Sequence, residues 1–254
     1  MLDRSIGVII VAGGSGTRCG GALPKQFRIL GTKPVLAHTI EQFHAALPMA
    51  EIVVVLPEEH IDFWKDLAAR FALPKHAVVA GGKERFYSVR NGIEALTTDP
   101  ELIAVQDGVR PLATAELIER VAHEAVASGA AIPVVRPADS FRRVDAEGGS
   151  EIVDRSALRC VQTPQIFGAE VLRRAYRQEF SAVFTDDASV VEHAGHAIAL
   201  VEGEATNLKI TTPHDFTLAR GILLAREEEE EAKREAEEEA LHDGGLEVDP
   251  VVRP

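Results

Sequence analysis

Short apolar runs alternate with amphipathic stretches along the first half of the chain. The runs are rich in Val, Ile and Leu, which predicts buried strands at residues 6–11, 51–56, 76–80, 102–105 and 130–135. Between several of these runs, apolar residues recur at helical spacing, which predicts helices near residues 61–71, 86–96 and 115–128. Strands separated by helices form mostly parallel sheets with helices on both faces. The pattern therefore predicts an α/β fold.

The pattern changes between residues 136 and 160. Charged residues alternate there, and Gly148-Gly149 separates two short strand-like pieces, which predicts a β-hairpin arm projecting from the sheet. An arm of this kind cannot bury its own apolar side chains. We therefore expect it to pack against a second copy of the chain, as a homodimer.

The chain ends in a long polar stretch. A helix is expected from residue 214 to 223, and it continues into a run of Glu, Lys and Arg that begins at Arg226. Every face of this extension is polar, which predicts a solvated helix that frays, followed by a disordered segment at residues 243–254. We divide the chain into a folded domain at residues 1–225, with the arm at 136–160, and an acidic tail at 226–254.

The acidic tail accounts for most of the charge imbalance. The 254-residue chain has a formal net charge of −13, and residues 226–254 hold 12 acidic and 4 basic side chains, a net of −8 that leaves −5 for the rest. The tail is expected to be a solubilising extension, with an acidic interaction tail as the alternative. Aromatic residues make up 5% of the chain and do not cluster with basic ones, so we expect no nucleic-acid partner.

Two further features bear on the compartment. The N-terminal apolar stretch is short, is interrupted by Gly7 and follows Asp3 and Arg4, so it resembles neither a signal peptide nor a membrane span. The two cysteines, Cys19 and Cys160, are too few for a disulfide framework or a zinc cluster. We therefore expect a cytoplasmic protein that does not bind membranes.

A glycine-rich loop follows the first predicted strand, at residues 12–18. Its glycines allow backbone N–H groups to approach phosphate oxygens, and Arg18 and Lys25 bring two cations to the same place. The spacing fits neither a P-loop, which needs Lys-Ser or Lys-Thr after the glycines, nor a dinucleotide fingerprint, whose third glycine position is Cys19 here. The loop indicates a polyphosphate site, with a plain strand-to-helix turn as the alternative.

Later clusters fall at the ends of predicted strands, where α/β folds assemble their sites. They lie at residues 81–89, 106–111, 161–167 and 184–189, and a further segment, 207–211, places Lys209 on an expected late strand. Asp107 can help to hold a Mg²⁺ ion that bridges phosphates, and Arg110 can bind a phosphate bidentately. Each cluster alone also fits a turn, a helix cap or a surface residue.

The order of the motifs is more specific than any one of them. VAGGSGTR, PKQF, GGKERFYSV, QDGVRP, VQTPQIF, FTDDAS and NLKIT together resemble the 2-C-methyl-D-erythritol 4-phosphate cytidylyltransferase family, from about residue 6 to 223. The resemblance implies a Rossmann-like nucleotidyltransferase fold with a mostly parallel central sheet and a projecting β-arm. It also implies the reaction, in which methylerythritol phosphate attacks the α-phosphorus of CTP and releases pyrophosphate, in non-mevalonate isoprenoid biosynthesis.

The resemblance also implies roles for individual residues. The catalytic residues would be Arg18, Lys25, Arg155 and Lys209. The residues that bind CTP would be Ala12, Gly13, Gly14, Gly16, Gly81, Gly82, Arg85, Ser88 and Asp107. The residues that bind the polyol phosphate would be Asp107, Arg110, Ser140, Arg155, Thr163, Thr185 and Lys209, with Ser140 and Arg155 supplied by the arm of the second subunit. Asp107 would be the protein ligand of a Mg²⁺ cofactor.

Some residues depart from the family pattern. Gln106 and Gly108-Val109 stand where many members have His-Asp-Ala-Ala, Ser140 replaces a frequent Thr, and Arg142 replaces a frequent Lys. Related ribitol 5-phosphate cytidylyltransferases also carry an Asp-x-Val-Arg-Pro motif. A ribitol 5-phosphate cytidylyltransferase and a non-catalytic nucleotide-binding regulator are therefore the alternative functions.

Overall fold

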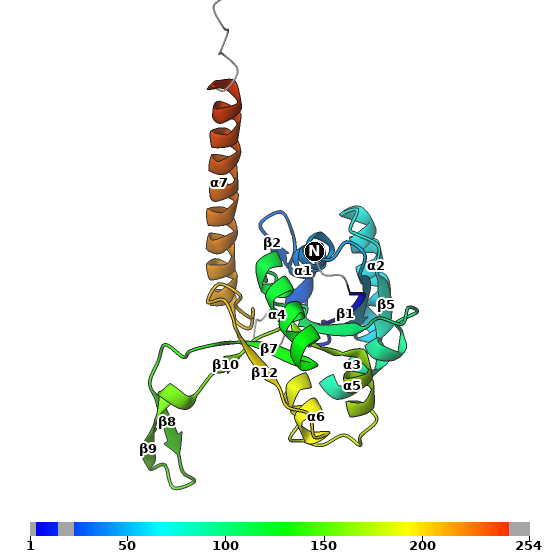
Figure 1. Ribbon diagram of the computed structural model, residues 1–254, viewed down its shortest axis with the longest axis vertical. Coiled ribbons are helices and arrows are strands. Elements are labelled where there is room, and N and C mark those ends of the chain that lie inside the picture. The colour runs from blue at the N-terminus through cyan, green and yellow to red at the C-terminus, as the bar shows by residue number, and fades with distance from the viewer. Residues whose placement is uncertain (1–3, 15–22, 244–254) are drawn as a thin grey trace, which may run out of the picture.

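A central β-sheet organises the molecule (Figure 1). The computed structural model describes residues 4–14 and 23–243. Within that part of the chain the sheet has eight strands, and β10, β7, β11, β6, β1, β4 and β5 follow one another while β12 pairs with β7. These strands are β1 (Ile6–Val11), β4 (Glu51–Leu56), β5 (Ala77–Ala80), β6 (Leu102–Asp107), β7 (Ala130–Val135), β10 (Cys160–Val161), β11 (Gln165–Gly168) and β12 (Ala199–Glu202).

The core of the sheet is parallel. Strand β1 pairs in parallel with β4 and β6, β4 with β5, and β7 with β12. Strands β10 and β11 run antiparallel to their neighbours, and β11 lies between β6 and β7. The prediction of a mostly parallel sheet is confirmed, whereas β11 was not predicted as a strand.

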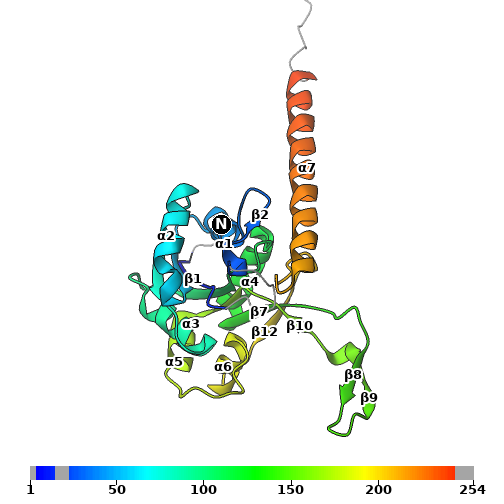
Figure 2. The same cartoon turned by 180° about the vertical axis from the view of Figure 1, so that it is seen from behind.

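Helices cover both faces of the sheet (Figures 1 and 2). One face packs against α1 (Val35–Ala46), α2 (Ile61–Arg70) and α4 (Ala115–Ser128), and the other against α3 (Arg85–Glu94), α5 (Ala169–Ala175) and α6 (Asp187–His193). The side chains of β1 point alternately to the two faces of the sheet. Val8 and Ile10 belong to the hydrophobic core on one face, and Ile9 belongs to the core on the other. A strand with apolar residues on both faces is typical of a doubly covered parallel sheet.

Most predicted elements agree with the structure to within a few residues. Strand β6 runs two residues further than expected, because Gln106 and Asp107 continue its pairing with Ile10 and Val11 of β1. Residues 207–211 were expected on a strand, and that prediction is wrong. The segment is irregular, and its Ile210 N–H donates to the Val109 carbonyl in the loop after β6.

The predicted arm is present. Strands β8 (Phe141–Val144) and β9 (Ser150–Val153) form an antiparallel hairpin that projects from the body of the molecule (Figure 1). Gly148 has φ +86° in the connecting turn, a conformation that favours glycine. Val144 and Ile152 are exposed on the hairpin at 66% and 79%. The arm therefore presents apolar side chains that its own chain does not cover.

The chain then forms a long terminal helix, α7 (Pro213–Asp243). Ala219 is buried and packs with Leu30 and Val35, so the first turns of α7 attach to the body. From Glu227 the helix is exposed as far as its burial is described, and it extends away from the body (Figure 1). The segment expected to be disordered lies largely outside the described residues, and the boundary at residue 225 stays a prediction. No helix of residues 4–14 and 23–243 is both long and apolar enough to cross a membrane.

Three short elements and a small hairpin complete the part of the chain that the structure describes. Single 3₁₀ turns lie at η2 (Lys25–Phe27), η3 (Glu58–His60) and η4 (Arg155–Ala157), and β2 (Ile29–Leu30) pairs with β3 (Lys33–Pro34). The turn η2 follows the glycine-rich loop. It therefore places Lys25 beside the carboxyl end of the sheet.

Candidate active site

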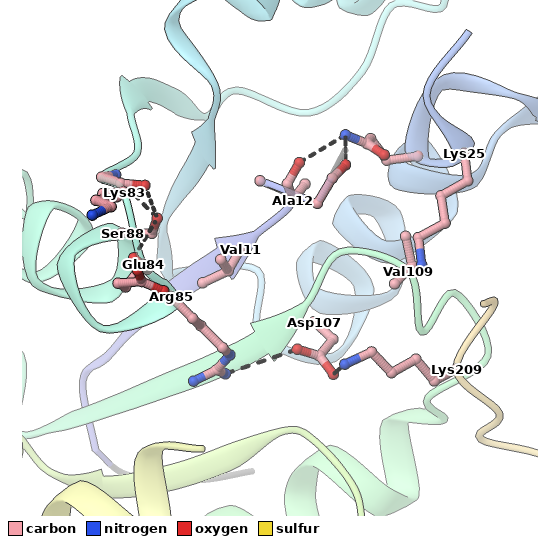
Figure 3. A pocket seen from close by; sticks show the side chains of 14 residues that line it. Val11, Ala12, Lys25, Lys83, Glu84, Arg85, Ser88, Asp107, Val109 and Lys209 are labelled. Atoms are coloured by element: carbon pink, nitrogen blue, oxygen red, sulfur yellow. Dashed lines mark hydrogen bonds and ion pairs between the residues drawn. The ribbon is translucent and has the colours of Figure 1, made fainter. Parts of the chain in front are cut away.

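A cavity of about 290 Å³ opens at the carboxyl ends of β1 and β6 (Figure 3). Its walls come from the loop after β1, the turn η2, the loop before α3, the end of β6 and the segment 207–211. The lining residues are Val11, Ala12, Gly13, Gly14, Lys25, Gln26, Gly82, Lys83, Glu84, Arg85, Ser88, Asp107, Val109 and Lys209. Open α/β sheets bind ligands at this edge.

The side chain of Gln26 holds the glycine-rich loop in place through hydrogen bonds. The Gln26 Nε2 donates to the Ala12 carbonyl at 2.8 Å and to the Gly14 carbonyl at 3.3 Å, and its side chain is buried. These bonds hold the start of the loop with its backbone at the cavity wall. Gln26 was not among the predicted site residues, although it lies in the quoted PKQF motif. The predicted residues Gly16 and Arg18 lie outside the described residues.

Two lysines approach the cavity from one side, opposite Arg85 (Figure 3). Lys25 is buried, and its Nζ donates to the Ile210 carbonyl at 2.8 Å. Lys209 belongs to the same irregular segment as Ile210 and is 43% exposed. Contact between Lys25 and this segment brings together two cations that are 184 positions apart in the sequence.

The loop before α3 closes the opposite wall. The Gly82 N–H donates to the Ser88 Oγ at 3.1 Å, and the Ser88 hydroxyl donates to the Glu84 carbonyl at 3.3 Å. A Cβ at Gly82 would lie 2.3 Å from the Cβ of Tyr87, so only glycine fits there without a shift of the helix. The loop therefore lies tightly against α3, and Gly82 also lines the cavity.

Asp107 lies at the centre of a group of cations. Its Oδ2 lies 2.9 Å from the Lys209 Nζ and 3.5 Å from the Arg110 Nε, and its Oδ1 lies 3.8 Å from the NH2 of Arg85. Burial alone would raise the pKa of the Asp107 carboxyl, but Arg85, Lys209 and Arg110 outweigh it and lower the pKa below its usual range. Arg85 also pairs with the buried carboxylate of Asp187, so three cations meet two carboxylates here, and the remaining positive charge suits phosphate groups.

Arg110 and Thr163 support Asp107 from behind the cavity. The Asp107 N–H donates to the Thr163 Oγ1 at 3.1 Å, and the Arg110 NH1 donates to the Asn207 carbonyl at 2.7 Å. Burial lowers the pKa of Arg110, and the Asp107 carboxylate only partly opposes this. Both predicted residues therefore contact Asp107, but neither lines the cavity.

Three predicted substrate residues lie away from the cavity. Thr185 is exposed, and its N–H donates to the Ser189 Oγ at the start of α6. Ser140 and Arg155 are exposed near the base of the arm, where Arg155 donates to the Ala138 carbonyl. Neither Ser140 nor Arg155 lines the cavity of its own chain.

Comparisons of sequence and of structure with known proteins point to one family. The family model described as 2-C-methyl-D-erythritol 4-phosphate cytidylyltransferase matches residues 6–225. The chain belongs to this family. Enzymes of that name from Bacteroides fragilis and Bacteroides thetaiotaomicron are 47% and 48% identical over 216 and 217 residues, which is 85% of this chain and 98% of each relative.

Solved structures of the cytidylyltransferase family share the fold. The Thermus thermophilus 2-C-methyl-D-erythritol 4-phosphate cytidylyltransferase is 34% identical with a TM-score of 0.69, covering 86% of this chain and 98% of that one. The 4-diphosphocytidyl-2C-methyl-D-erythritol synthase of Anaerococcus prevotii is 28% identical with a TM-score of 0.73, covering 87% and 99%. The predictions of family, fold class and nucleotidyltransferase activity are confirmed.

Proposed function

We propose that this chain transfers CMP from CTP to 2-C-methyl-D-erythritol 4-phosphate, which gives 4-diphosphocytidyl-2-C-methyl-D-erythritol and pyrophosphate. Family membership supports the substrates. The observation that carries the proposal is the net positive charge around Asp107 at the carboxyl edge of the sheet, where Arg85, Arg110 and Lys209 meet only two carboxylates, those of Asp107 and Asp187. A site that brings together two phosphorylated reactants needs cations in this number and place.

The nucleotide is proposed to lie along the glycine-rich wall. Backbone groups of Ala12, Gly13 and Gly14 and of Gly81 and Gly82 hold CTP from both sides. Arg85, Ser88 and Asp107 complete this binding set. Glycines allow the backbone to approach a ligand closely, and Gly13, Gly14 and Gly82 line the cavity.

The transfer itself is a displacement at phosphorus. An oxygen of the methylerythritol phosphate attacks the α-phosphorus of CTP, a P–O bond forms, and the bond to the β-phosphate breaks to release pyrophosphate. Lys25 and Arg18 are proposed to stabilise the negative charge that develops on the triphosphate. A phosphate monoester is largely a dianion near neutral pH, so the nucleophile needs no general base.

The attacking phosphate is proposed to be positioned by Lys209 and by Arg155 of a second subunit. Arg110, Thr163 and Thr185 of the subunit that supplies Lys209, together with Ser140 of the second subunit, complete the polyol phosphate site. The exposed apolar side chains of the arm support a homodimer, because a hairpin with such side chains gains stability by packing against another surface. Sedimentation that shows only monomer at micromolar concentration would contradict this arrangement.

A Mg²⁺ ion is proposed to accompany CTP. In the described parts of the chain no group of three or more His, Cys, Asp and Glu side chains could hold a metal ion by itself. Mg²⁺ commonly binds through one or two carboxylates together with substrate phosphates, and Asp107 supplies one carboxylate at the cavity. The donor set therefore fits a metal that arrives with the nucleotide, and such an ion neutralises phosphate charge. Chelation with EDTA is expected to stop turnover, and added Mg²⁺ to restore it.

The experiment that tests the function is a panel of substrates. Pyrophosphate release is measured with CTP, ATP, GTP and UTP, each combined with methylerythritol phosphate or ribitol 5-phosphate. We expect release with CTP and methylerythritol phosphate. Turnover of ribitol phosphate alone would show that the polyol assignment is wrong, and CTP binding without any turnover would favour a regulator. We also propose that the protein is cytoplasmic, in keeping with its metabolic substrates.

A further inference from the structure

A fully buried carboxylate lies directly behind Arg85. Asp187, the first residue of α6, is 0% exposed. It accepts two hydrogen bonds from the guanidinium, from NH1 to Oδ1 at 2.9 Å and from NH2 to Oδ2 at 2.7 Å. Two parallel bonds of this kind define both the position and the plane of a guanidinium. The orientation of Arg85 at the cavity wall is therefore set by a residue 102 positions further along the chain.

Asp187 is itself held by neighbours other than the arginine. The Tyr176 hydroxyl donates to its Oδ1 at 2.5 Å. Gln165 of β11 holds the residues on either side of Asp187. Its Nε2 donates to the Asp186 Oδ2 and its Oε1 accepts from the Ala188 N–H, each at 2.9 Å. These contacts hold Asp187 in place independently of Arg85. The arginine side chain is longer and 30% exposed, so its position depends on Asp187 rather than the reverse.

Arg85 lies between two carboxylates. Its NH2 is 2.7 Å from the Asp187 Oδ2 and 3.8 Å from the Asp107 Oδ1. A guanidinium released from Asp187 can move this short distance and form a charge-assisted hydrogen bond with Asp107. Such a bond would occupy the Oδ1 of Asp107, while Lys209 already contacts the Oδ2.

We propose that Asp187 is a positioning residue, which holds the Arg85 guanidinium at the cavity wall and keeps it from binding Asp107 directly. Arg85 then faces the nucleotide, and Asp107 keeps one oxygen for the bound reactants. Asp187 is fully buried and does not line the cavity, so it acts through Arg85. The inference rests on the proposed function, because that function assigns Arg85 to CTP.

A double-mutant cycle tests the inference. Asp187→Asn keeps the size of the side chain and removes its charge, and Arg85→Gln removes the residue through which Asp187 is proposed to act. We expect Asp187→Asn to weaken CTP binding in isothermal titration by about 10- to 100-fold, the order of effect expected of a misplaced binding group. The KM for CTP should also rise, and by a larger factor than the factor by which kcat falls. In the Arg85→Gln background, Asp187→Asn should change the Kd for CTP by less than about twofold, since residues that act through one contact are not additive.

Two further variants complete the design. Asp99→Asn is the matched control, because it breaks the surface ion pair with Arg173, 2.6 Å long, on the neighbouring helix α5. It should leave CTP binding unchanged. Tyr176→Phe removes only the hydroxyl that holds Asp187, and it serves as the second variant if Asp187→Asn does not fold. It should weaken CTP binding by roughly fivefold, the effect of about one hydrogen bond, and only when Arg85 is present.

The outcomes separate the inference from the function on which it rests. Normal CTP affinity in folded Asp187→Asn, or in Tyr176→Phe where Asp187→Asn does not fold, would overturn the positioning role. Equal losses of affinity with and without Arg85 would also overturn it, because they indicate a general structural effect. The titration needs no polyol phosphate. A wild-type protein that binds CTP but transfers nothing to methylerythritol phosphate would contradict the proposed function and leave the cycle interpretable.

Discussion

Mixing two inactive variants tests whether the arm of one subunit completes the cavity of another. Lys25 lies in the cavity wall, whereas Arg155 is exposed on the arm of the same chain and does not line that cavity. Lys25→Ala and Arg155→Ala should each lose about 10²- to 10³-fold in kcat, the typical cost of removing one preorganised group that stabilises transition-state charge.

The recovery on mixing follows from the geometry of a shared site. If subunits exchange at random, half of the dimers in an equal mixture contain one copy of each variant. In such a dimer, the cavity of the Arg155→Ala subunit keeps Lys25 and receives an intact Arg155 from its partner, while the other cavity lacks both. About a quarter of all sites are therefore intact, and the mixture should recover roughly 25% of wild-type activity. If Arg155 acts within its own chain, no site is intact and nothing is recovered.

The assay is pyrophosphate release after the two purified variants have exchanged subunits, with differently tagged copies to confirm that mixed dimers form. Lys25→Ala mixed with Lys209→Ala is the matched control, because both residues line the cavity of one chain. This control should recover no activity. Mixed dimers of Lys25→Ala and Arg155→Ala that remain inactive would refute the shared site, and recovery in the control would refute the assignment of both lysines to one chain.

Three further predictions concern stability and the tail. Because folding lowers the pKa of Asp107, its ionised form stabilises the fold above the ordinary carboxyl pKa of about 3.9, and this contribution is lost as the pH falls below that value. The difference in unfolding free energy between wild type and Asp107→Asn should therefore shrink from roughly pH 6 to pH 3 in urea titrations, and a constant difference would contradict the charge assignment. Gly92→Ala should destabilise by about 1–3 kcal/mol in urea unfolding, because its Cβ would lie 2.5 Å from the Ile9 Cγ2, whereas the control Gly221→Ala meets no atom within 4 Å and should not destabilise. Deleting residues 227–254 should leave kcat/KM within about twofold of wild type, because the exposed helix lies beyond the family match, and a tenfold loss would show that the tail contributes.

The sequence predicted the edge of the sheet at which the site forms. Asp107 was expected after a strand ending at residue 105, and it proves to be the last residue of β6, opposite Val11 of β1. The motifs near residues 13 and 82 fall on the walls of the same cavity. This prediction succeeds because strand order and direction bring the carboxyl ends of parallel strands to one place.

The partners of the site residues were not predictable in the same way. Asp186 and Asp187 are adjacent and chemically identical, yet one caps α6 and the other is buried against Arg85. Gln26 likewise stands in a quoted motif, and only the folded chain shows that it holds the carbonyls of the glycine-rich loop. Such contacts join residues that are separated in the sequence, so no local sequence pattern predicts them.

The sequence by itself therefore determined the α/β fold, the projecting arm and the family, because hydrophobic periodicity and ordered motifs are local properties of the chain. The tertiary structure decided which charges meet. It placed Lys209 on an irregular segment rather than a strand, brought that segment to Lys25 through the Ile210 carbonyl, and set Arg85 between Asp187 and Asp107. These arrangements depend on distances between separate elements, which packing alone establishes.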